Sequence, residues 1–329
     1  MILGIDTSNY TTSIAAVDHG VIVSDRRRLL TVKDGDRGLR QQEALFQHLG
    51  NLPELYRELM EDIGEGHIDA VACSVRPRPV EGSYMPVFMA GKGFAEVIAD
   101  TLRVPLYEFS HQEGHAEAAS KGTLFEGESS YVFFHLSGGT TEAVALPEYD
   151  LCGRTLDISF GQLIDRTGVA LGMRFPCGKE MDELALSELH APKVSCSEWV
   201  QKHPKSPVPD GCLPGIKVSG GEVNLSGIES ACQRVIAADG CPDRGVFCRV
   251  LFDRIADALW KMVMQIRVKS GKDGFLFAGG VSSSMYIRDR LKVLCGSSGD
   301  GISIAFGEPD LCRDNAVGIA LLGEKSYGA

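Results

Sequence analysis

Two stretches of the chain share one pattern of apolar and polar positions. Residues 2–17 form an apolar run, a short polar turn and a second apolar run, and residues 131–146 repeat this pattern around Ser, Gly and Thr. The pattern is typical of a β-hairpin that opens a sheet. Because the two copies lie about 130 residues apart, we interpret them as the starts of two related lobes.

The rest of the chain alternates between helical and strand patterns. Leucines at helical spacing predict a helix over residues 39–60; they are Leu45, Leu49, Leu52, Leu55 and Leu59. The other expected elements are a buried strand at 68–75, a helix at 85–102, a short strand at 105–110, an amphipathic helix at 247–271, a strand that runs into a glycine turn within 275–284, and a closing helix at 314–326. Residues 191–221, rich in Pro, Ser and Gly, predict irregular structure. This alternation predicts an α/β protein of two lobes around a cleft, with ligand at the glycine-rich turns.

The composition narrows the class of protein. Of the 329 residues, 44% are hydrophobic and 23% are charged, which is typical of globular proteins and excludes a disordered chain, a collagen and a coiled coil. The 33 basic and 44 acidic residues give a net charge of −11. Polyanions are held largely by Lys and Arg, so a nucleic-acid role would need a local basic patch or a basic partner.

The sequence also bears on location. It contains no apolar run long enough to span a membrane, and its first ten residues, with Asp6 inside the first apolar run, do not resemble a signal peptide. The ten cysteines are scattered and form no CxxC pair. We therefore expect reduced thiols in a cytoplasmic protein.

The sequence HQEGH at residues 111–115 is the sharpest chemical signal. His111 and His115 are one helical turn apart, so their imidazoles share a helix face and can chelate one metal. The motif differs from the HExxH of zinc proteases, because Glu113 is misplaced for the general base. On spacing alone, a metal site and a pair of exposed helix histidines are equally open, and any third ligand must come from far along the chain.

Three polar turns offer backbone N–H groups for phosphate or nucleoside binding. The turn LSGGTT at residues 136–141 could cradle phosphate through its amides and hydroxyls, and the turn at residues 6–9 offers the same chemistry. The sequence AGGVSSS at residues 278–284 could let the backbone approach an adenine or a ribose. Taken alone, each is more typical of an ordinary tight turn.

Several charged residues have both a functional and a structural interpretation. Arg76 and Arg78 alternate with prolines and could meet an anionic substrate or form a solvated loop. Asp157, Asp165 and Asp182 lie where helical spacing restarts after Gly or Pro. Such carboxylates could hold ribose hydroxyls or a metal, or could cap helices, and capping is our interpretation for Asp157.

The order of the motifs is more informative than any one of them. They are the opening GIDTS turn, the HQEGH helix, the SGG turn, GxxxD at 161–165, PCG at 176–178, SGI at 226–228, GGV at 279–281 and DNA at 314–316. In this order they resemble the family of the universal tRNA threonylcarbamoyladenosine transferase, TsaD in bacteria, once named O-sialoglycoprotein endopeptidase. The resemblance covers essentially the whole chain. It implies the two-lobed actin-like ATPase and sugar-kinase fold, with lobe I at 1–125 plus the closing helix 310–329, and lobe II at 126–309.

The resemblance also implies the residues of the site. One metal, iron or zinc, would be held by His111, His115 and Asp314. The adenylate substrate would lie along the SGG turn, with further residues at its ribose and adenine ends. The implied substrate-binding residues are His135, Leu136, Ser137, Gly138, Gly139, Thr140, Asp165, Gly178, Asp182, Gly279, Gly280 and Ser284, of which Ser137 and Asp165 are the implied catalytic residues.

The implied activity is metal-dependent transfer of a threonylcarbamoyl or carbamoyl group. The group would pass from its adenylate to N6 of an adenosine in tRNA, and AMP would leave. The adenylate is already an activated mixed anhydride, so the protein mainly has to position it and stabilise charge. By resemblance, a second protein of the same fold is an implied partner.

The chain departs from the family pattern in several loops. Thr140 replaces a family histidine, Ser284 replaces an asparagine, and Arg76–Pro79 replaces a Gly-Pro-Gly loop. Asn9–Thr12 replaces an acidic pair, and Gly178–Lys179 replaces a glycine-proline pair. These departures fit a divergent paralogue and leave the acceptor open. The alternatives are carbamoyl or acyl transfer to a small molecule or a protein, and a nucleotide-binding scaffold without turnover.

Overall fold

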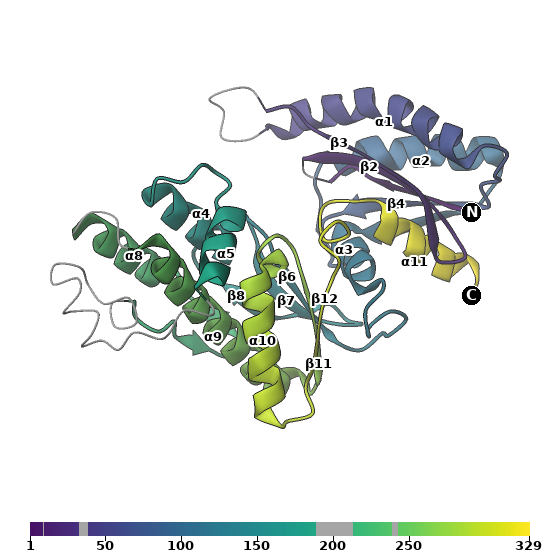
Figure 1. Ribbon diagram of the computed structural model, residues 1–329. Helices are drawn as coiled ribbons and strands as arrows, with labels where there is room; N and C mark the ends of the chain where they lie inside the picture. The colour runs from purple at the N-terminus through teal and green to yellow at the C-terminus, as the bar shows by residue number, and fades with distance from the viewer. Residues whose placement is uncertain (9, 33–38, 189–212, 239–242) are drawn as a thin grey trace. The chain divides into compact units, whose positions relative to one another are not determined.

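The computed structural model describes residues 1–8, 10–32, 39–188, 213–238 and 243–329. These residues form two compact units, one of Met1–Glu126 with Asp310–Ala329 and the other of Gly127–Pro309 (Figure 1). Each unit contains one β-sheet and its own hydrophobic clusters.

The first unit is built on a five-stranded sheet with the order β3-β2-β1-β4-β5. The strands are β1 (Ile2–Asp6), β2 (Thr11–Asp18), β3 (Val21–Leu29), β4 (Ala70–Arg76) and β5 (Leu106–Ser110). Strands β1 and β2 pair antiparallel, which confirms the hairpin predicted at the start of the chain. Strands β4 and β5 then extend the sheet in parallel beside β1.

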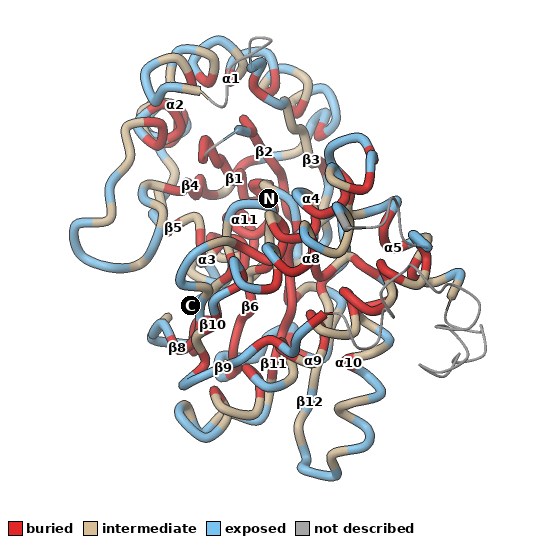
Figure 2. Tube along the Cα trace, turned by 90° about the vertical axis from the view of Figure 1, so that its left-hand side faces the viewer, coloured by how far each residue is buried: buried red, intermediate tan, exposed pale blue. Residues whose placement is uncertain are grey.

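Alternation along β1 sends its side chains to two different helical layers. Leu3 and Ile5 pack against α1 (Gln41–Ile63) and α2 (Phe88–Leu102). Ile2, on the other face, packs against α11 (Val317–Tyr327). Helix α3 (His111–Ser120) lies beside α11 in this second layer (Figure 1), and the buried strands run between the two layers in Figure 2.

The predicted leucine face of α1 is only partly buried. Leu52, Leu55 and Leu59 are buried, whereas Leu49 is 53% exposed. At 3.6 residues per turn, Leu49 points roughly 90° away from the mean direction of those three leucines. The helix itself is confirmed, but its buried stripe is narrower than the leucine pattern indicated.

The second unit is built on a seven-stranded sheet with the order β12-β11-β6-β7-β8-β10-β9. The strands are β6 (Val132–Leu136), β7 (Thr141–Ala145), β8 (Asp150–Thr155), β9 (Val218–Ser219), β10 (Glu222–Val223), β11 (Gly274–Ala278) and β12 (Ser303–Phe306). The helices are α4 (Phe160–Ala170), α5 (Gly178–Ser187), α8 (Ser226–Ala238), α9 (Arg244–Ser270) and α10 (Met285–Ser298), with a 3₁₀ turn at Val281–Ser283. Antiparallel pairing of β6 with β7 confirms the second predicted hairpin. One large cluster of buried aromatic and aliphatic side chains joins the sheet to these helices.

Two expected elements differ from the structure. Of the segment 191–221, residues 191–212 lie outside the described residues. The remainder contains the β9–β10 hairpin, closed by Gly220 and Gly221 with φ of 61° and 84°, a pair of positive φ values that favours a tight two-residue turn. The closing helix begins at Val317, because the Asn315 side chain accepts the amides of Val317 and Gly318 and so ends the preceding turn.

No helix in the described ranges is both long and apolar enough to cross a membrane.

Candidate functional site

The end of β1 points a carboxylate toward helix α3. Because side chains alternate along a strand, Asp6 shares the face of Ile2 and Gly4, which is the face covered by α11. Its Oδ1 accepts the Ser8 amide at 2.7 Å and the Ser74 hydroxyl at 3.0 Å. Its Oδ2 lies 2.6 Å from His111 Nδ1. The sequence interpretation considered Asp6 only as part of a polar turn and missed this contact.

Helix α3 presents its two histidines on one face. Ser110 and Glu113 form a reciprocal capping box that starts the helix. The ring centroids of His111 and His115 are 4.2 Å apart. The Glu113 carboxylate accepts the Ser110 amide at 2.7 Å. Glu113 thus serves the helix start, which supports the argument against a zinc-protease motif.

Two glycines let α11 approach α3 closely. A Cβ atom on Gly318 would lie 1.8 Å from the Gly114 carbonyl oxygen, and one on Gly114 would lie 2.8 Å from Ile319 Cδ1. Gly114 stands between the two histidines in the HQEGH motif. Its missing side chain therefore allows the turn before α11 to come near the imidazoles.

That turn carries Asp314 to the histidines. Asp314 Oδ1 lies 3.3 Å from His115 Nε2 and 3.7 Å from His111 Nε2. The ligand atoms of the three residues all lie within 4.8 Å of one another. We call His111, His115 and Asp314 the metal triad. Asp314 lies about 200 positions after the two histidines in the sequence, and the family resemblance named these same three residues.

Burial lowers the pKa of both imidazoles, but the neighbouring charges leave the two rings with opposite net shifts. Burial lowers the pKa of His111, but the charge and hydrogen bond of Asp6, aided by Asp314, reverse this and raise it to about 9. For His115, burial and the nearby charge of His111 together lower the pKa, and Asp314 offsets only part of the effect. One imidazole is thus tied to a carboxylate, while the other favours its neutral, ligating form.

The metal triad fits a transition-metal ion. Two imidazole nitrogens and a carboxylate oxygen are a donor set that zinc and iron accept. A tetrahedral ion with ligands at about 2.0–2.1 Å separates those ligands by roughly 3.4 Å. The separations of 3.3 Å and 3.7 Å from Asp314 to the two imidazoles are near this value, and the ligand atoms of all three residues lie within 4.8 Å of one another.

In the second unit, the SGG turn is held by its own hydrogen bonds. The Ser137 amide donates to the Thr140 carbonyl at 2.8 Å, and the Thr140 amide donates to the Ser137 hydroxyl at 3.0 Å. Among the described residues, nothing lies within 4 Å of a Cβ built on Gly138 or Gly139. The turn is fixed in shape, while its glycine backbone is exposed.

Neighbouring glycines bring other segments against this turn. A Cβ on Gly161 would lie 2.6 Å from the Ser137 carbonyl oxygen, so the start of α4 packs directly on it. Gly279 has a φ of 96°, and a Cβ there would lie 2.4 Å from the Leu136 carbonyl oxygen. Gly280 follows at the start of the 3₁₀ turn, and His135 pairs in register with Ala278. The structure therefore brings the predicted residues of the SGG turn and of the GGV motif together.

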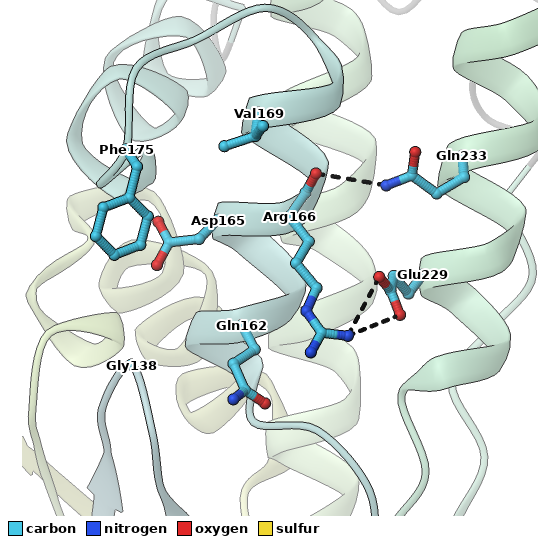
Figure 3. A pocket seen from close by; sticks show the side chains of 8 residues that line it. All are labelled: Gly138, Gln162, Asp165, Arg166, Val169, Phe175, Glu229 and Gln233. Carbon is cyan, nitrogen blue, oxygen red and sulfur yellow. Dashed lines mark hydrogen bonds and ion pairs between the residues drawn. The ribbon is translucent and has the colours of Figure 1, made fainter. Parts of the chain in front are cut away.

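A pocket of about 560 Å³ opens between α4 and α8. Two predicted residues, Gly138 and Asp165, line it; the others are Gln162, Arg166, Val169, Phe175, Glu229 and Gln233. We call it the α4–α8 pocket. Figure 3 shows the Asp165 carboxylate beside the Phe175 ring, and Arg166 reaching Glu229 across the pocket at 3.4 Å. The sequence interpretation missed Arg166 and Glu229, although they directly follow the GxxxD and SGI motifs.

The three aspartates flagged in the sequence all accept backbone amides, and in each case an accepted amide comes from a different segment of the chain. Asp165 lies in the middle of α4 and accepts the Cys177 amide at 2.8 Å, next to Gly178. Asp182 accepts the Met285 amide at 2.9 Å and the Ser284 hydroxyl at the start of α10. Asp157 accepts the Leu225 and Ser226 amides at 2.8 and 2.9 Å, which confirms its capping role, although the helix is α8. The expectation that Asp165 and Asp182 begin helices was wrong.

Comparisons with known proteins identify the family. The TsaD model, described as tRNA N6-adenosine threonylcarbamoyltransferase, matches residues 31–321. A tRNA N6-adenosine threonylcarbamoyltransferase of Neorickettsia sennetsu is 28% identical over 97% of this chain and 92% of its own length. A probable bifunctional tRNA threonylcarbamoyladenosine biosynthesis protein of Methanothermobacter thermautotrophicus is also 28% identical, over 99% of this chain and 55% of its own length.

Solved structures support the fold. Component A of the Acidaminococcus fermentans (R)-2-hydroxyglutaryl-CoA dehydratase superposes with a TM-score of 0.54 at 13% identity, covering 100% of this chain and 99% of that one. HypF of T. kodakarensis gives 0.52 at 11% identity, covering 99% of this chain and 47% of that one. The predicted class, an α/β protein of the actin-like ATPase and sugar-kinase fold, is confirmed. With the family model matching most of the sequence, the chain belongs to the TsaD family.

Proposed function

We propose that this protein transfers a threonylcarbamoyl group from its adenylate to N6 of an adenosine in tRNA, with release of AMP. The observation that carries the proposal is the metal triad, His111, His115 and Asp314, assembled within 4.8 Å in a chain of the TsaD family. The relatives matched over nearly the whole chain bear this activity in their names.

We assign the metal triad to one iron or zinc ion. His111 and His115 would bind it through Nε2, and Asp314 through its carboxylate. When bound, such an ion supplies Lewis acidity toward the carbonyl oxygens of the transferred group. The partial exposure of Asp314, at 26%, supports a site that substrate can reach.

We assign the adenylate to the SGG turn and the α4–α8 pocket. The exposed amides of Gly138 and Gly139 suit phosphate oxygens, and the Ser137 hydroxyl holds the turn in shape. Asp165, fixed by the Cys177 amide, suits the ribose hydroxyls. The Val169 and Phe175 side chains add apolar surface. We keep the other implied residues as proposals for the ribose and adenine ends: His135, Leu136, Thr140, Gly178, Asp182, Gly279, Gly280 and Ser284.

The chemistry then requires mainly positioning and charge stabilisation. The N6 lone pair forms a bond to the carbamoyl carbon. The bond from that carbon to the phosphate oxygen breaks, AMP leaves with the electron pair, and N6 loses one proton to solvent. Amides along Ser137–Gly139 would hold the phosphate as its charge grows.

A second candidate is the same group transfer to another acceptor, a small molecule or a protein. It is favoured by the loop Arg76–Pro79, which replaces the family's Gly-Pro-Gly. Arg76 is exposed at the end of β4 and pairs in register with Ser110, directly before the metal-binding helix. An Arg-Pro loop at this position alters the surface that an acceptor would meet.

The test supplies the purified protein with threonylcarbamoyl-adenylate and tRNA, with and without a second protein of the same fold. Mass spectrometry of the digested tRNA is expected to find threonylcarbamoyl-adenosine, and stoichiometric AMP. No modified nucleoside under any of these conditions would exclude the tRNA activity. Carbamoyl transfer to other acceptors, found by metabolite profiling, would then favour the second candidate. Nucleotide binding without any product would indicate a scaffold.

We also propose a cytoplasmic location. The support is that four of the described cysteines, Cys73, Cys152, Cys177 and Cys295, are free thiols. Free thiols persist in reducing compartments.

A further inference from the structure

We infer that Asp6 is a positioning residue for the metal triad: it holds His111 with Nδ1–H toward β1, so that Nε2 is the atom presented to Asp314. The inference rests on the proposed metal site and adds a residue outside it. Asp6 is 2% exposed and its Oδ2 lies 2.6 Å from His111 Nδ1. The other ring nitrogen of His111 is the one 3.7 Å from Asp314 Oδ1.

The carboxylate of Asp6 is itself fixed in one orientation. Its Oδ1 accepts the Ser8 amide at 2.7 Å and the Ser74 hydroxyl at 3.0 Å, from the end of β1 and from β4. A backbone amide can only donate, so Oδ1 is held as an acceptor. The remaining oxygen, Oδ2, is thereby aimed at α3.

This arrangement decides which imidazole nitrogen carries the proton. An ionised carboxylate only accepts hydrogen bonds, so His111 Nδ1 must be the donor. In a neutral ring the lone pair then lies on Nε2, the nitrogen on the side of Asp314 and His115. Partners of this kind orient metal-binding histidines, and their loss typically lowers metal affinity 10–100-fold.

An isosteric substitution of Asp6 is expected to move the proton of the neutral His111 ring from Nδ1 to Nε2. In Asp6→Asn, the amide oxygen must stay toward the Ser8 N–H, so the NH₂ group faces His111 Nδ1. Nδ1 then becomes the acceptor, and the neutral ring carries its proton on Nε2, where it blocks the lone pair. The matched control is Ser74→Ala, which removes one hydrogen bond from Asp6 and leaves the contact with His111.

The experiment measures zinc affinity by competition with a chromophoric chelator and records the imidazole ¹⁵N–¹H NMR spectrum. Wild-type protein loaded with zinc is expected to show the His111 proton on Nδ1. We expect Asp6→Asn to bind zinc about 10–100-fold more weakly, with the proton on Nε2 in the metal-free form. Ser74→Ala should keep the wild-type proton position and stay within about 3-fold of its affinity.

Three results would overturn the inference. Equal zinc affinity of Asp6→Asn and wild type would remove the positioning role while leaving the metal site intact. A His111 proton on Nε2 in zinc-loaded wild type would also overturn it, and this measurement decides the matter even if Asp6→Asn does not fold. Wild type that binds no zinc would refute the metal site itself. A protein that binds zinc as described but forms no modified nucleoside would leave the inference standing and refute only the proposed function.

Discussion

The metal triad and the α4–α8 pocket, in the roles that we propose for them, would recognise ligands by opposite means. The triad uses side chains of chemically distinctive types, and a buried carboxylate supports one of them. The turn at the edge of the pocket uses exposed backbone, and glycines determine its shape and its contacts. A site made of side chains can therefore be recognised in a sequence from residue types and their spacing. A site made of backbone can be recognised mainly from glycines, the positions without a side chain.

Because of this difference, substitutions at the two sites are expected to have different structural effects. Removing a side chain from the triad deletes a ligand, while adding one near the SGG turn would displace backbone. The two sites lie in different units, so a change at one is expected to leave the binding step at the other unchanged.

Loss of a ligand should have the largest effect. We expect His115→Ala to lower zinc or iron affinity by more than about 100-fold, because losing a direct ligand exceeds the 10–100-fold loss typical of an outer partner. Elemental analysis of protein purified without chelators measures it. The matched control is Glu113→Gln, which keeps a residue able to complete the capping box and lies off the ligand face. Nucleotide affinity should be unchanged in both variants, and a parallel fall would contradict the separation of the two sites.

The corresponding change in the pocket is Asp165→Ala. A hydrogen bond to a charged group contributes about 1.5–3 kcal/mol, so affinity for an adenylate analogue should fall by a factor of roughly 10–150. Isothermal titration calorimetry measures the change. Metal content should stay at the wild-type level. Unaltered analogue affinity would remove Asp165 from the proposed binding residues.

A change that disturbs the packing of α3 on α11 should lower both the stability of the fold and the affinity for metal. Gly318→Ala places a Cβ where it would overlap the Gly114 carbonyl, and such overpacking typically costs about 1–3 kcal/mol. We expect a lower melting temperature and weaker zinc binding, because α11 carries the turn with Asp314. Gly296→Ala in α10 is the control, since among the described residues nothing lies within 4 Å of its Cβ position. A Gly318→Ala protein with wild-type zinc affinity would show that Asp314 does not depend on this close approach.

The smallest effect concerns a cap in the second unit. Burial raises the pKa of Asp157, but the amides of Leu225, Ser226 and Ile158 outweigh it and lower the pKa from 3.8 to about 2. Because the folded-state pKa is lowered, the stabilisation is complete above about pH 4 and is lost as the pH falls toward 2. Asp157→Asn should therefore reduce the free energy of unfolding by about 1 kcal/mol at pH 7, and by progressively less below pH 4.

Thermal melts at several pH values check the sign of this effect. The control is Asp150→Asn, which removes the charge of an exposed carboxylate on β8 and leaves the start of α8 untouched. A destabilisation by Asp157→Asn that grew as the pH fell would contradict the assignment.

Several features were predictable from sequence because they depend on local pattern. Both hairpins follow from apolar alternation, and the shared face of His111 and His115 follows from helical spacing. The resemblance, and not spacing, supplied Asp314, because nothing local relates a residue to a partner about 200 positions earlier. The role of Asp6 was in principle visible, since a carboxylate within a buried strand needs a partner. The partner's identity depended on the face that β1 turns toward α3.

The pocket was harder to predict. Arg166 and Glu229 meet only because α4 and α8 pack side by side, and no periodicity within either helix indicates that pairing. The capping of α10 by Asp182, and of α8 by Asp157, likewise joins residues that are distant in sequence. Sequence pattern predicts elements, whereas these contacts are properties of their tertiary arrangement.

The return of α11 to the first unit bears on how the chain folds during synthesis. The first unit contains both Met1–Glu126 and Asp310–Ala329, and the whole second unit is translated between them. Domains tend to fold as units in the order in which they leave the ribosome. Here the first sheet must wait, with the α11 side of β1 and β2 uncovered, until about 180 further residues have been made. The second unit, although later in sequence, is thus the first that can be completed, and a nascent chain halted before residue 310 would expose an apolar sheet face that chaperones recognise.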